Sequence, residues 1–319
     1  MATSSFTDSP TKRGKCRIVH DVKSIDVDSE RLGNQEGLFF HFNMDTVFST
    51  KYSMLIIGPD DSPYNGGFYL FDAQFPDQYP FMPMKMTSIT QGGDIRKHPN
   101  LYVCGKCCFS FLGTWSGPPW TACQNPISVG LSMRSVLTNN PLQNEPGFEI
   151  QKTQKERDVS ELYELIIVYF NIKYAVVGVV RNIRKNYIHF KDHINRIFVE
   201  NYLIYKAQLM KCAKYAGQTI KSPVWKFSVH FDYNELNNEL DSLYCSLGGT
   251  IEHSAASGSI PSVPSMPPGL KQKKKYARKS PKETAANFET GTIMVGLDGR
   301  QWIVKYYPNL DKKRWVISH

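Results

Sequence analysis

Near the N-terminus, apolar residues recur at spacings of three and four, at Ile18, Val19, Val22 and Ile25. Residues spaced in this way share one face of a helix, so the pattern predicts a short amphipathic helix over residues 15–25. Residues 1–14 are rich in Ser and Thr and lack such a pattern. We predict that they form a disordered tail.

Apolar and aromatic runs follow at residues 38–42, 47–57 and 68–75. Runs of this kind are typical of strands, and a turn-forming sequence at 58–63 lies between two of them, so the pattern predicts an antiparallel meander. Residues 126–137 then carry apolar side chains at helical spacing and predict a buried helix. We expect all of these elements to form one domain, residues 15–149.

Long helical patterns alternate with polar joints at residues 163–184, 194–215 and 233–247. We expect these helices to pack on the preceding domain as a helical extension, residues 150–247. Residues 248–288 are dominated by Ser, Gly, Pro and Lys, a composition that cannot bury a core. They are predicted to be a linker.

The last segment, residues 289–319, regains strand-like runs at 292–295, 302–307 and 314–317. The dipeptides Asp298-Gly299 and Pro308-Asn309 lie between these runs and are typical of turns. We therefore predict a small β-rich module. A module of so few strands is only marginally stable by itself, so we expect it to interact with another surface.

Composition agrees with a folded chain, since 41% of the 319 residues are hydrophobic. The net charge is +9, and much of the excess lies in the predicted linker, at Lys271, Lys273, Lys274, Lys275, Arg278, Lys279 and Lys282. A nuclear-import signal or contact with an anionic surface would explain this cluster, and so would a solvated linker.

Cysteine usage and hydropathy indicate the compartment. The seven cysteines are unevenly spaced and do not suggest a disulfide framework, and no secretory signal is predicted. The most apolar window, residues 162–180, is interrupted by Glu164, Asn171 and Lys173, which argues against a membrane span. We therefore expect a location in the cytoplasm or nucleus and no membrane partner.

The candidate chemistry lies in the stretch that begins with His98, Pro99 and Asn100, because Cys108 follows Asn100 by eight residues. Pro99 and Gly105 favour an irregular loop on a packed core. A cysteine thiolate attacks carbonyls and can hold an acyl group as a thioester, while an amide offers N–H donors to the developing oxyanion. Cys108 is thus a candidate nucleophile and Asn100 its candidate helper.

This stretch resembles the ubiquitin-conjugating enzymes, whose signature is His-Pro-Asn with the acceptor cysteine eight residues after the Asn. Further segments that match this family are residues 58–59, 63–69, 79–83, 120, 127–137 and 140–141. Segments that resemble its class Z members are 112–118, 144–149, 217–219 and 230–233. The resemblance implies the α+β UBC fold, a four-stranded antiparallel meander sheet with an N-terminal helix, a central helix and C-terminal helices.

The resemblance also implies an activity. Cys108 would accept ubiquitin from an activating enzyme as a thioester and pass it to a lysine of a protein substrate, alone or with a ubiquitin ligase. ATP would be used upstream by the activating enzyme, so neither a cofactor nor a metal is expected. The sequence agrees, because it has no Gly-rich phosphate loop.

Roles of further residues follow from the same resemblance. Asn100 would hold the active-site loop or donate to the oxyanion during transfer. His98, Pro99 and Gly105 would support the same loop, and Asn144 or Glu145 would orient the incoming lysine. Candidate contacts to the activating enzyme or a ligase are Lys15, Arg17, Phe81 and Gln124. Simple packing is an equal explanation for Phe81, and a solvated helix face is the default for Lys15 and Arg17.

Cys107 and Cys108 compete for the role of nucleophile. Successive side chains of an extended backbone point to opposite faces, so only one of them can share a pocket with Asn100. The spacing selects Cys108, and Cys107 is expected to be a buried thiol. His98 is expected to brace the loop, since a lone histidine is more often structural than a general base.

Other functions compete with this hypothesis. Cys104, Cys107, His98 and Cys123 could together hold zinc, although a second Cys-x-x-Cys is absent. A catalytically inactive ubiquitin-binding module is disfavoured by the presence of Cys108, and a conjugating enzyme for another ubiquitin-like modifier stays open. Nucleic-acid binding is disfavoured, since only the basic linker supports it.

Overall fold

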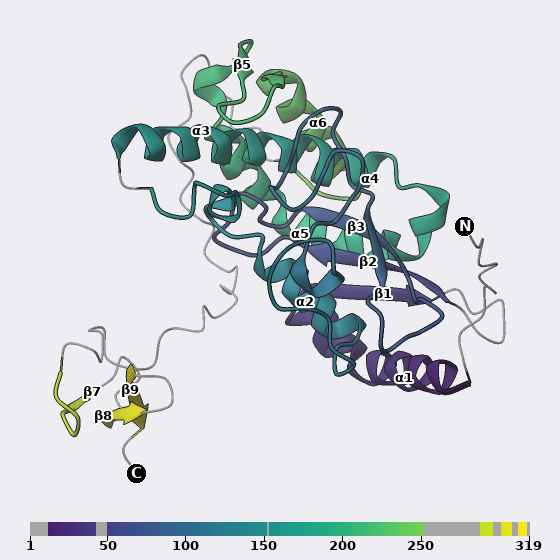
Figure 1. The fold of residues 1–319 in the computed structure, drawn as a ribbon. Helices are drawn as coiled ribbons and strands as arrows, with labels where there is room; N and C mark the ends of the chain where they lie inside the picture. The colour runs from purple at the N-terminus through teal and green to yellow at the C-terminus, as the bar shows by residue number, and fades with distance from the viewer. Residues whose placement is uncertain are drawn as a thin grey trace, which may run out of the picture. The chain divides into compact units, whose positions relative to one another are not determined.

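The computed structural model describes residues 12–42, 50–151, 153–251, 288–295, 301–307 and 312–317. The chain forms two compact units, Met1–His253 and Ser254–His319, each taken by itself below (Figure 1). Residues 1–11 of the predicted tail and 252–287 of the predicted linker lie outside the described residues.

The first helix, α1 (Lys12–Asn34), is longer than the predicted 15–25, and residues 12–14 are helical although they were assigned to the tail. Its buried face continues because Ile18, Ile25 and Leu32 are spaced seven apart, which is two helical turns. The polar segment between Ile25 and Leu32 hid this repeat from the sequence pattern.

A four-stranded sheet forms the centre of the first unit and confirms the predicted meander. Its strands are β1 (Leu38–Phe42), β2 (Lys51–Ile57), β3 (Phe68–Gln74) and β4 (Lys85–Ser88). Sheet order follows chain order and every pairing is antiparallel. Residues 47–49, expected to begin the second strand, lie outside the described residues.

Helix α2 (Pro126–Ser135) packs on one face of this sheet, in front of it in Figure 1. A capping box fixes its start, since the Asn125 side chain accepts the Ser128 N–H and the Ser128 hydroxyl accepts the Asn125 N–H. A Cβ at Gly130 would lie 3.0 Å from the Met54 sulfur, so the glycine allows close approach to the sheet.

The opposite face carries the 3₁₀ segment η4 (Lys185–Phe190) and helix α5 (Lys191–Met210). The His189 ring stacks on His41 at 3.5 Å, and His193 contacts Phe39 at 4.5 Å between ring centroids. Phe39 and His41 alternate with the β1 residues that face α2, so the sheet lies between two helical layers.

The predicted helix over 163–184 corresponds to a stretch formed by α3 (Gln154–Phe170), the π-helical η3 (Asn171–Gly178) and α4 (Val179–Arg181), which starts earlier than predicted and ends before residues 182–184. A Thr153–Glu156 capping box starts it earlier than the apolar pattern suggested. By length and composition the stretch could cross a membrane, but 67% of its apolar window is buried inside the protein. It is a core helix of this unit.

A buried polar network joins the extension to the sheet domain. Asn171 is fully buried, and its side chain accepts a 2.7 Å hydrogen bond from the Tyr69 hydroxyl and donates to the Asn65 carbonyl at 3.0 Å. The Tyr205 hydroxyl donates to the Gly66 carbonyl at 2.9 Å. Because these groups would be left unpaired if the parts separated, the extension and the sheet domain form one structure.

The rest of the extension contains the 3₁₀ turn η5 (Ala213–Tyr215), a hairpin of β5 (Thr219–Lys221) and β6 (Ser228–His230), and helix α6 (Tyr233–Ser246). The hairpin was not predicted, because its strands are too short to show an alternating pattern. Helix α6 packs on α5, where the Tyr244 ring stacks on Tyr202 at 3.9 Å.

In the second unit, β7 (Ile293–Val295), β8 (Gln301–Tyr307) and β9 (Lys312–Ile317) form an antiparallel sheet in that order. This sheet confirms the predicted β-rich module. Val304 is fully buried within it. The predicted turns at 298–299 and 308–309 lie outside the described residues.

Candidate active site

The loop that carries the candidate nucleophile is attached to the end of β4. Gly105 accepts a 2.8 Å hydrogen bond from the Ser88 N–H, and Thr87 forms a β-bridge with Lys106. Gly105 has a φ of +88°, and a Cβ there would lie 3.0 Å from the Ser88 carbonyl oxygen. Only glycine combines this conformation with so close an approach, so Gly105 sets the course of the chain toward Cys108.

Asn100 and Cys108 are joined by two hydrogen bonds. The Cys108 N–H donates to the Asn100 carbonyl at 2.8 Å, and Asn100 Nδ2 donates to the Cys108 carbonyl at 2.7 Å. The amide therefore holds the backbone of the candidate nucleophile and is directed at its carbonyl. This arrangement corresponds to the loop-holding role proposed for Asn100, while an oxyanion contact stays a prediction.

The Cys108 thiol lies under the segment that follows it. The residue is 3% exposed, and its S–H donates to the Thr114 carbonyl at 3.2 Å. The Thr114 hydroxyl accepts from the Phe109 N–H and donates to the Cys107 carbonyl. After the 3₁₀ turn η1 (Ser110–Leu112) and its left-handed cap Gly113, these contacts hold the Thr114 carbonyl against the sulfur.

Cys107 belongs to the hydrophobic core. It is 2% exposed, and burial raises the pKa of its thiol to about 12. A thiol with so high a pKa is almost wholly protonated at neutral pH and is a poor nucleophile. Asn100 bonds to Cys108 and makes no hydrogen bond to Cys107 among the described residues.

His98 braces the loop from inside. It is fully buried, its Nδ1 accepts the Asn100 N–H at 3.0 Å, and its Nε2 lies 3.1 Å from the Val136 carbonyl, just after α2. With Nδ1 an acceptor, Nε2 carries the proton and donates it to Val136. Burial, aided by the charges of Lys97 and Arg96, lowers the His98 pKa to about 3. Both nitrogens are occupied, so neither is available to take a proton from a substrate.

Sequence reasoning missed several residues that hold this loop. Arg96 Nη2 donates to the Pro99 carbonyl at 2.6 Å, and the Tyr64 hydroxyl donates to the Lys97 carbonyl at 2.8 Å. Tyr64 lies in a segment that matched the family, which was a usable signal. Arg96 is adjacent in sequence to the loop, but nothing in the pattern indicated which group its side chain contacts.

Asn144 and Glu145 lie at the end of the 3₁₀ turn η2 (Pro141–Asn144). Asn144 Nδ2 donates to the Pro141 carbonyl at 3.3 Å, and the Glu145 N–H donates to the Leu142 carbonyl. Within the described part of the chain, neither side chain hydrogen-bonds to Cys108 or Asn100. Their role toward an incoming lysine stays a prediction.

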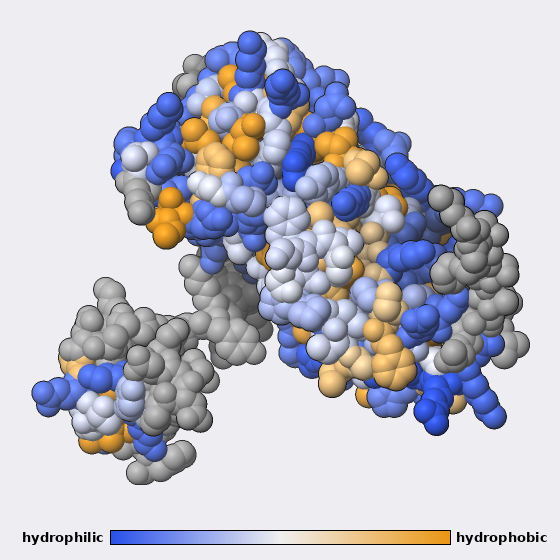
Figure 2. Space-filling view, viewed as in Figure 1, coloured by the Kyte–Doolittle hydropathy of each residue, from blue (hydrophilic) through white to orange (hydrophobic). Residues whose placement is uncertain are grey.

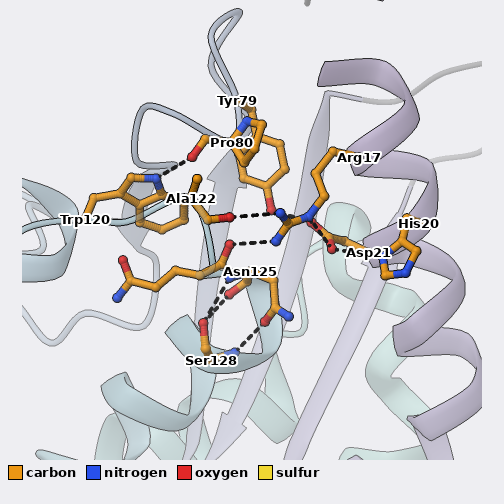
Figure 3. Close-up of polar contacts among 10 residues, drawn as sticks. Arg17, His20, Asp21, Tyr79, Pro80, Trp120, Ala122, Asn125 and Ser128 are labelled. Atoms are coloured by element: carbon orange, nitrogen blue, oxygen red, sulfur yellow. Dashed lines mark hydrogen bonds and ion pairs between the residues drawn. The ribbon is translucent and has the colours of Figure 1, made fainter. Parts of the chain in front are cut away.

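Arg17 ties α1 to the loop before α2 (Figure 3). Its Nε pairs with Asp21 at 2.9 Å, while Nη1 and Nη2 donate to the carbonyls of Ala122 and Gln124 at 2.8 and 3.1 Å. Asp21 is buried and also accepts a short hydrogen bond from the Tyr79 hydroxyl. Contact with a partner stays a prediction for Arg17, whose guanidinium is engaged within the molecule.

The other partner-binding candidates lie on or near the same surface region. The Gln124 side chain accepts the Thr121 N–H, and Trp120 Nε1 donates to the Pro80 carbonyl next to Phe81. Phe81 is 73% exposed, so the packing explanation does not account for it. Lys15 lies on α1 and is partly buried. On the face shown in Figure 2, hydrophobic residues are interspersed with polar ones.

The residues proposed for zinc do not form a shared donor set. Cys104 and Cys123 are exposed, Cys107 is in the core, and His98 uses both ring nitrogens. Among the described residues no group of three or more His, Cys, Asp or Glu side chains could hold a metal ion.

A family model described as "Ubiquitin-conjugating enzyme" matches residues 26–169. "Ubiquitin-conjugating enzyme E2 Z" of Xenopus tropicalis is 32% identical over 237 residues, which are 69% of this chain and 75% of the relative. The Homo sapiens protein of the same name is 37% identical over 193 residues, 60% of this chain and 54% of its own. "Probable ubiquitin-conjugating enzyme protein 17" of Caenorhabditis elegans is 40% identical over 149 residues, 45% of this chain and 20% of its own.

The four-stranded meander sheet with helices on both faces is the UBC fold, and the residues that the family model matches include Asn100 and Cys108. The chain belongs to the ubiquitin-conjugating enzyme family, and among its relatives it is similar to the E2 Z proteins. It matches about half the length of the human and rat E2 Z proteins.

Proposed function

We propose that this protein is a ubiquitin-conjugating acyltransferase, which carries ubiquitin as a thioester on Cys108 and passes it to a lysine amine. The single observation that supports this most strongly is the double hydrogen bond between Asn100 and Cys108. Membership of the family and the presence of both residues argue against an inactive ubiquitin-binding module.

The first chemical step is exchange between two thioesters. The Cys108 thiol loses its proton, its sulfur attacks the glycyl carbonyl of ubiquitin on the activating enzyme, and the activating enzyme's cysteine leaves as thiolate. One carbon–sulfur bond forms as another breaks, so the step is near balance in free energy. No nucleotide is required at this site, because ATP is used upstream to form the first thioester.

In the second step a lysine amine attacks the Cys108 thioester, an amide bond forms, and the Cys108 sulfur leaves and regains a proton. Asn100 keeps the Cys108 backbone fixed while the carbonyl carbon of the ubiquitin thioester becomes tetrahedral. His98 has no free nitrogen for general-base catalysis. The amine's proton therefore passes to water or to a group nearer the thioester, for which Glu145 is the candidate.

Cys108 must become accessible for both steps. Its thiol is bonded to the Thr114 carbonyl and almost fully covered in the free protein. We propose that docking of the activating enzyme displaces the segment around Thr114. Partner contact through Lys15, Arg17, Phe81 and Gln124, and a cytoplasmic or nuclear location, belong to the same proposal.

A charging assay tests the function. The protein is incubated with ATP, each available ubiquitin-activating enzyme and either ubiquitin or a related modifier, and the products are separated with and without thiol reductant. We expect a reductant-sensitive adduct with ubiquitin that is absent from Cys108→Ala. A full-length protein that forms no adduct with any pair would overturn the proposal, and an adduct only with another modifier would reassign its substrate.

A further inference from the structure

Aromatic side chains of the helical extension contact Arg96, just before the active-site tripeptide. Trp225 lies between β5 and β6, far from the loop in sequence. Its ring lies 4.5 Å from the guanidinium carbon of Arg96, and the Tyr102 ring lies 4.0 Å from the same carbon. Arg96 thus contacts two aromatic rings, one from the loop and one from the extension.

Arg96 is attached to the candidate catalytic tripeptide at the same time. Its Nη2 donates to the Pro99 carbonyl at 2.6 Å, and its own carbonyl accepts the Tyr163 hydroxyl at 2.7 Å. The Tyr163 ring meets Trp225 edge to face at 5.3 Å. A chain of direct contacts therefore runs from the hairpin to the residue that precedes Asn100.

Arg96 is half-buried, and one edge of its guanidinium is shut off from water. Its Nε is buried and has no hydrogen-bond partner within the described part of the chain. The two rings therefore contribute to stabilising the positive charge on the side where Nε makes no hydrogen bond. A lysine could not replace this arrangement, because only a planar guanidinium offers a face to each ring while its edge bonds to a carbonyl.

We propose that Arg96 and Trp225 are positioning residues, through which the extension fixes the His98–Pro99–Asn100 tripeptide. The position of this tripeptide in turn sets the two hydrogen bonds between Asn100 and Cys108. The expected effect on the rate of ubiquitin transfer rests on the proposed function. The expected effect on the order of the active-site loop does not. The extension would then be required for transfer.

The test compares Trp225→Ala with Tyr244→Ala in the full-length protein. Both variants remove an aromatic side chain of the extension that packs on another aromatic ring. Tyr244 packs on Tyr202 and not on Arg96. Charging of Cys108 and discharge of the thioester to free lysine are measured separately, in single-turnover reactions. We expect Trp225→Ala to slow discharge about tenfold with little change in charging, because small displacements at a reacting centre are costly. Tyr244→Ala should leave discharge unchanged.

Conservative variants separate positioning from loss of fold. Trp225→Phe, which keeps an aromatic face for Arg96, should restore most of the discharge rate, whereas Arg96→Lys should slow it although the charge is kept. Equal discharge by Trp225→Ala and wild type would overturn the inference, and so would an equal loss in Tyr244→Ala.

Hydrogen exchange tests the inference without any activity. The Cys108 N–H bonds to the Asn100 carbonyl and the Leu101 N–H to the His98 carbonyl. Their exchange should accelerate in Trp225→Ala and not in Tyr244→Ala. Unchanged exchange would refute the positioning role. If the two variants differ in exchange as expected but the wild-type protein never forms a thioester, the proposed function is refuted and the positioning role stands.

Discussion

The carbonyl oxygen of Cys108 accepts a 2.7 Å hydrogen bond from the Asn100 side chain, while the Cys108 N–H donates to the Asn100 carbonyl at 2.8 Å. Both bonds fix the backbone on either side of the sulfur-bearing carbon. The thiol itself donates a hydrogen bond to the Thr114 carbonyl at 3.2 Å. Asn100 therefore controls where the sulfur is held.

Replacing Asn100 by Asp keeps the shape of the side chain and removes its N–H donors. We expect discharge of the Cys108 thioester to lysine to fall about tenfold or more, because the carboxylate repels the Cys108 carbonyl that the amide held. Single-turnover discharge measures this. Aminolysis by Asn100→Asp at the wild-type rate would show that the bond is dispensable.

His98 should make stability depend on pH. Its pKa falls from the ordinary 6.5 to about 3 in the folded protein. Between these two pH values the unfolded chain binds a proton at His98 and the folded protein does not. Its contribution to stability is therefore present above about pH 6.5 and is lost as the pH falls toward 3, by at most about 1.4 kcal/mol per pH unit. Denaturant unfolding should show a shallower acid decline for His98→Gln. Parallel declines would contradict this origin.

Lys97 is fully buried, with Gln91 Oε1 at 3.0 Å from its Nζ, and burial lowers its pKa to about 7. Below that pH the ammonium is charged in both the folded and unfolded states, and its desolvation weakens the fold. Between pH 7 and 10.5 the folded state releases the proton first, so stability rises with pH. Lys97→Met should raise the melting temperature more at pH 6 than at pH 9. A gain that does not depend on pH would exclude this cause.

The pair of Arg17 and Asp21 should be strongly coupled, because Asp21 is only 3% exposed. Arg17→Met leaves that carboxylate without its cation and should cost about 3 kcal/mol of unfolding free energy. Adding Asp21→Asn should recover part of the loss. The exposed pair Arg31 and Asp28 on the same helix is the control and should show no measurable coupling. Additive effects for Arg17 and Asp21 would contradict the expected coupling.

The sequence predicted those parts of the structure that leave a local pattern. The first three meander strands, the helix that ends just before Val136 and the three strands of the C-terminal unit all have short-range patterns, and all are present. Strand β4 showed no such pattern, and a fourth strand was expected only from the family resemblance. The turn at Gly105 was predicted from the residue type, and Cys108 was selected over Cys107 by its spacing from Asn100. Helix ends were less accurate, because α1 continues through a polar segment to bury Leu32.

Contacts between distant segments could not be predicted in this way. Nothing in a single sequence states that Trp225 lies on Arg96, or that Arg17 bonds to the carbonyls of residues 122 and 124. Such contacts depend on the fold as a whole, and their residues look like ordinary surface charges and loop aromatics. The covering of Cys108 by Thr114 was missed for the same reason, since it depends on a turn of the backbone.

The most direct measurement of the central claim is the chemistry of the bond to the modifier in two matched variants, Cys108→Ser and Cys107→Ser. After charging, we expect Cys107→Ser to carry ubiquitin in a bond that thiol reductant cleaves, as in the wild-type protein. Cys108→Ser should form either no adduct or an oxygen ester that resists reductant and is cleaved by alkali. A reductant-sensitive adduct on Cys108→Ser, with none on Cys107→Ser, would place the nucleophile on the other sulfur and contradict the account.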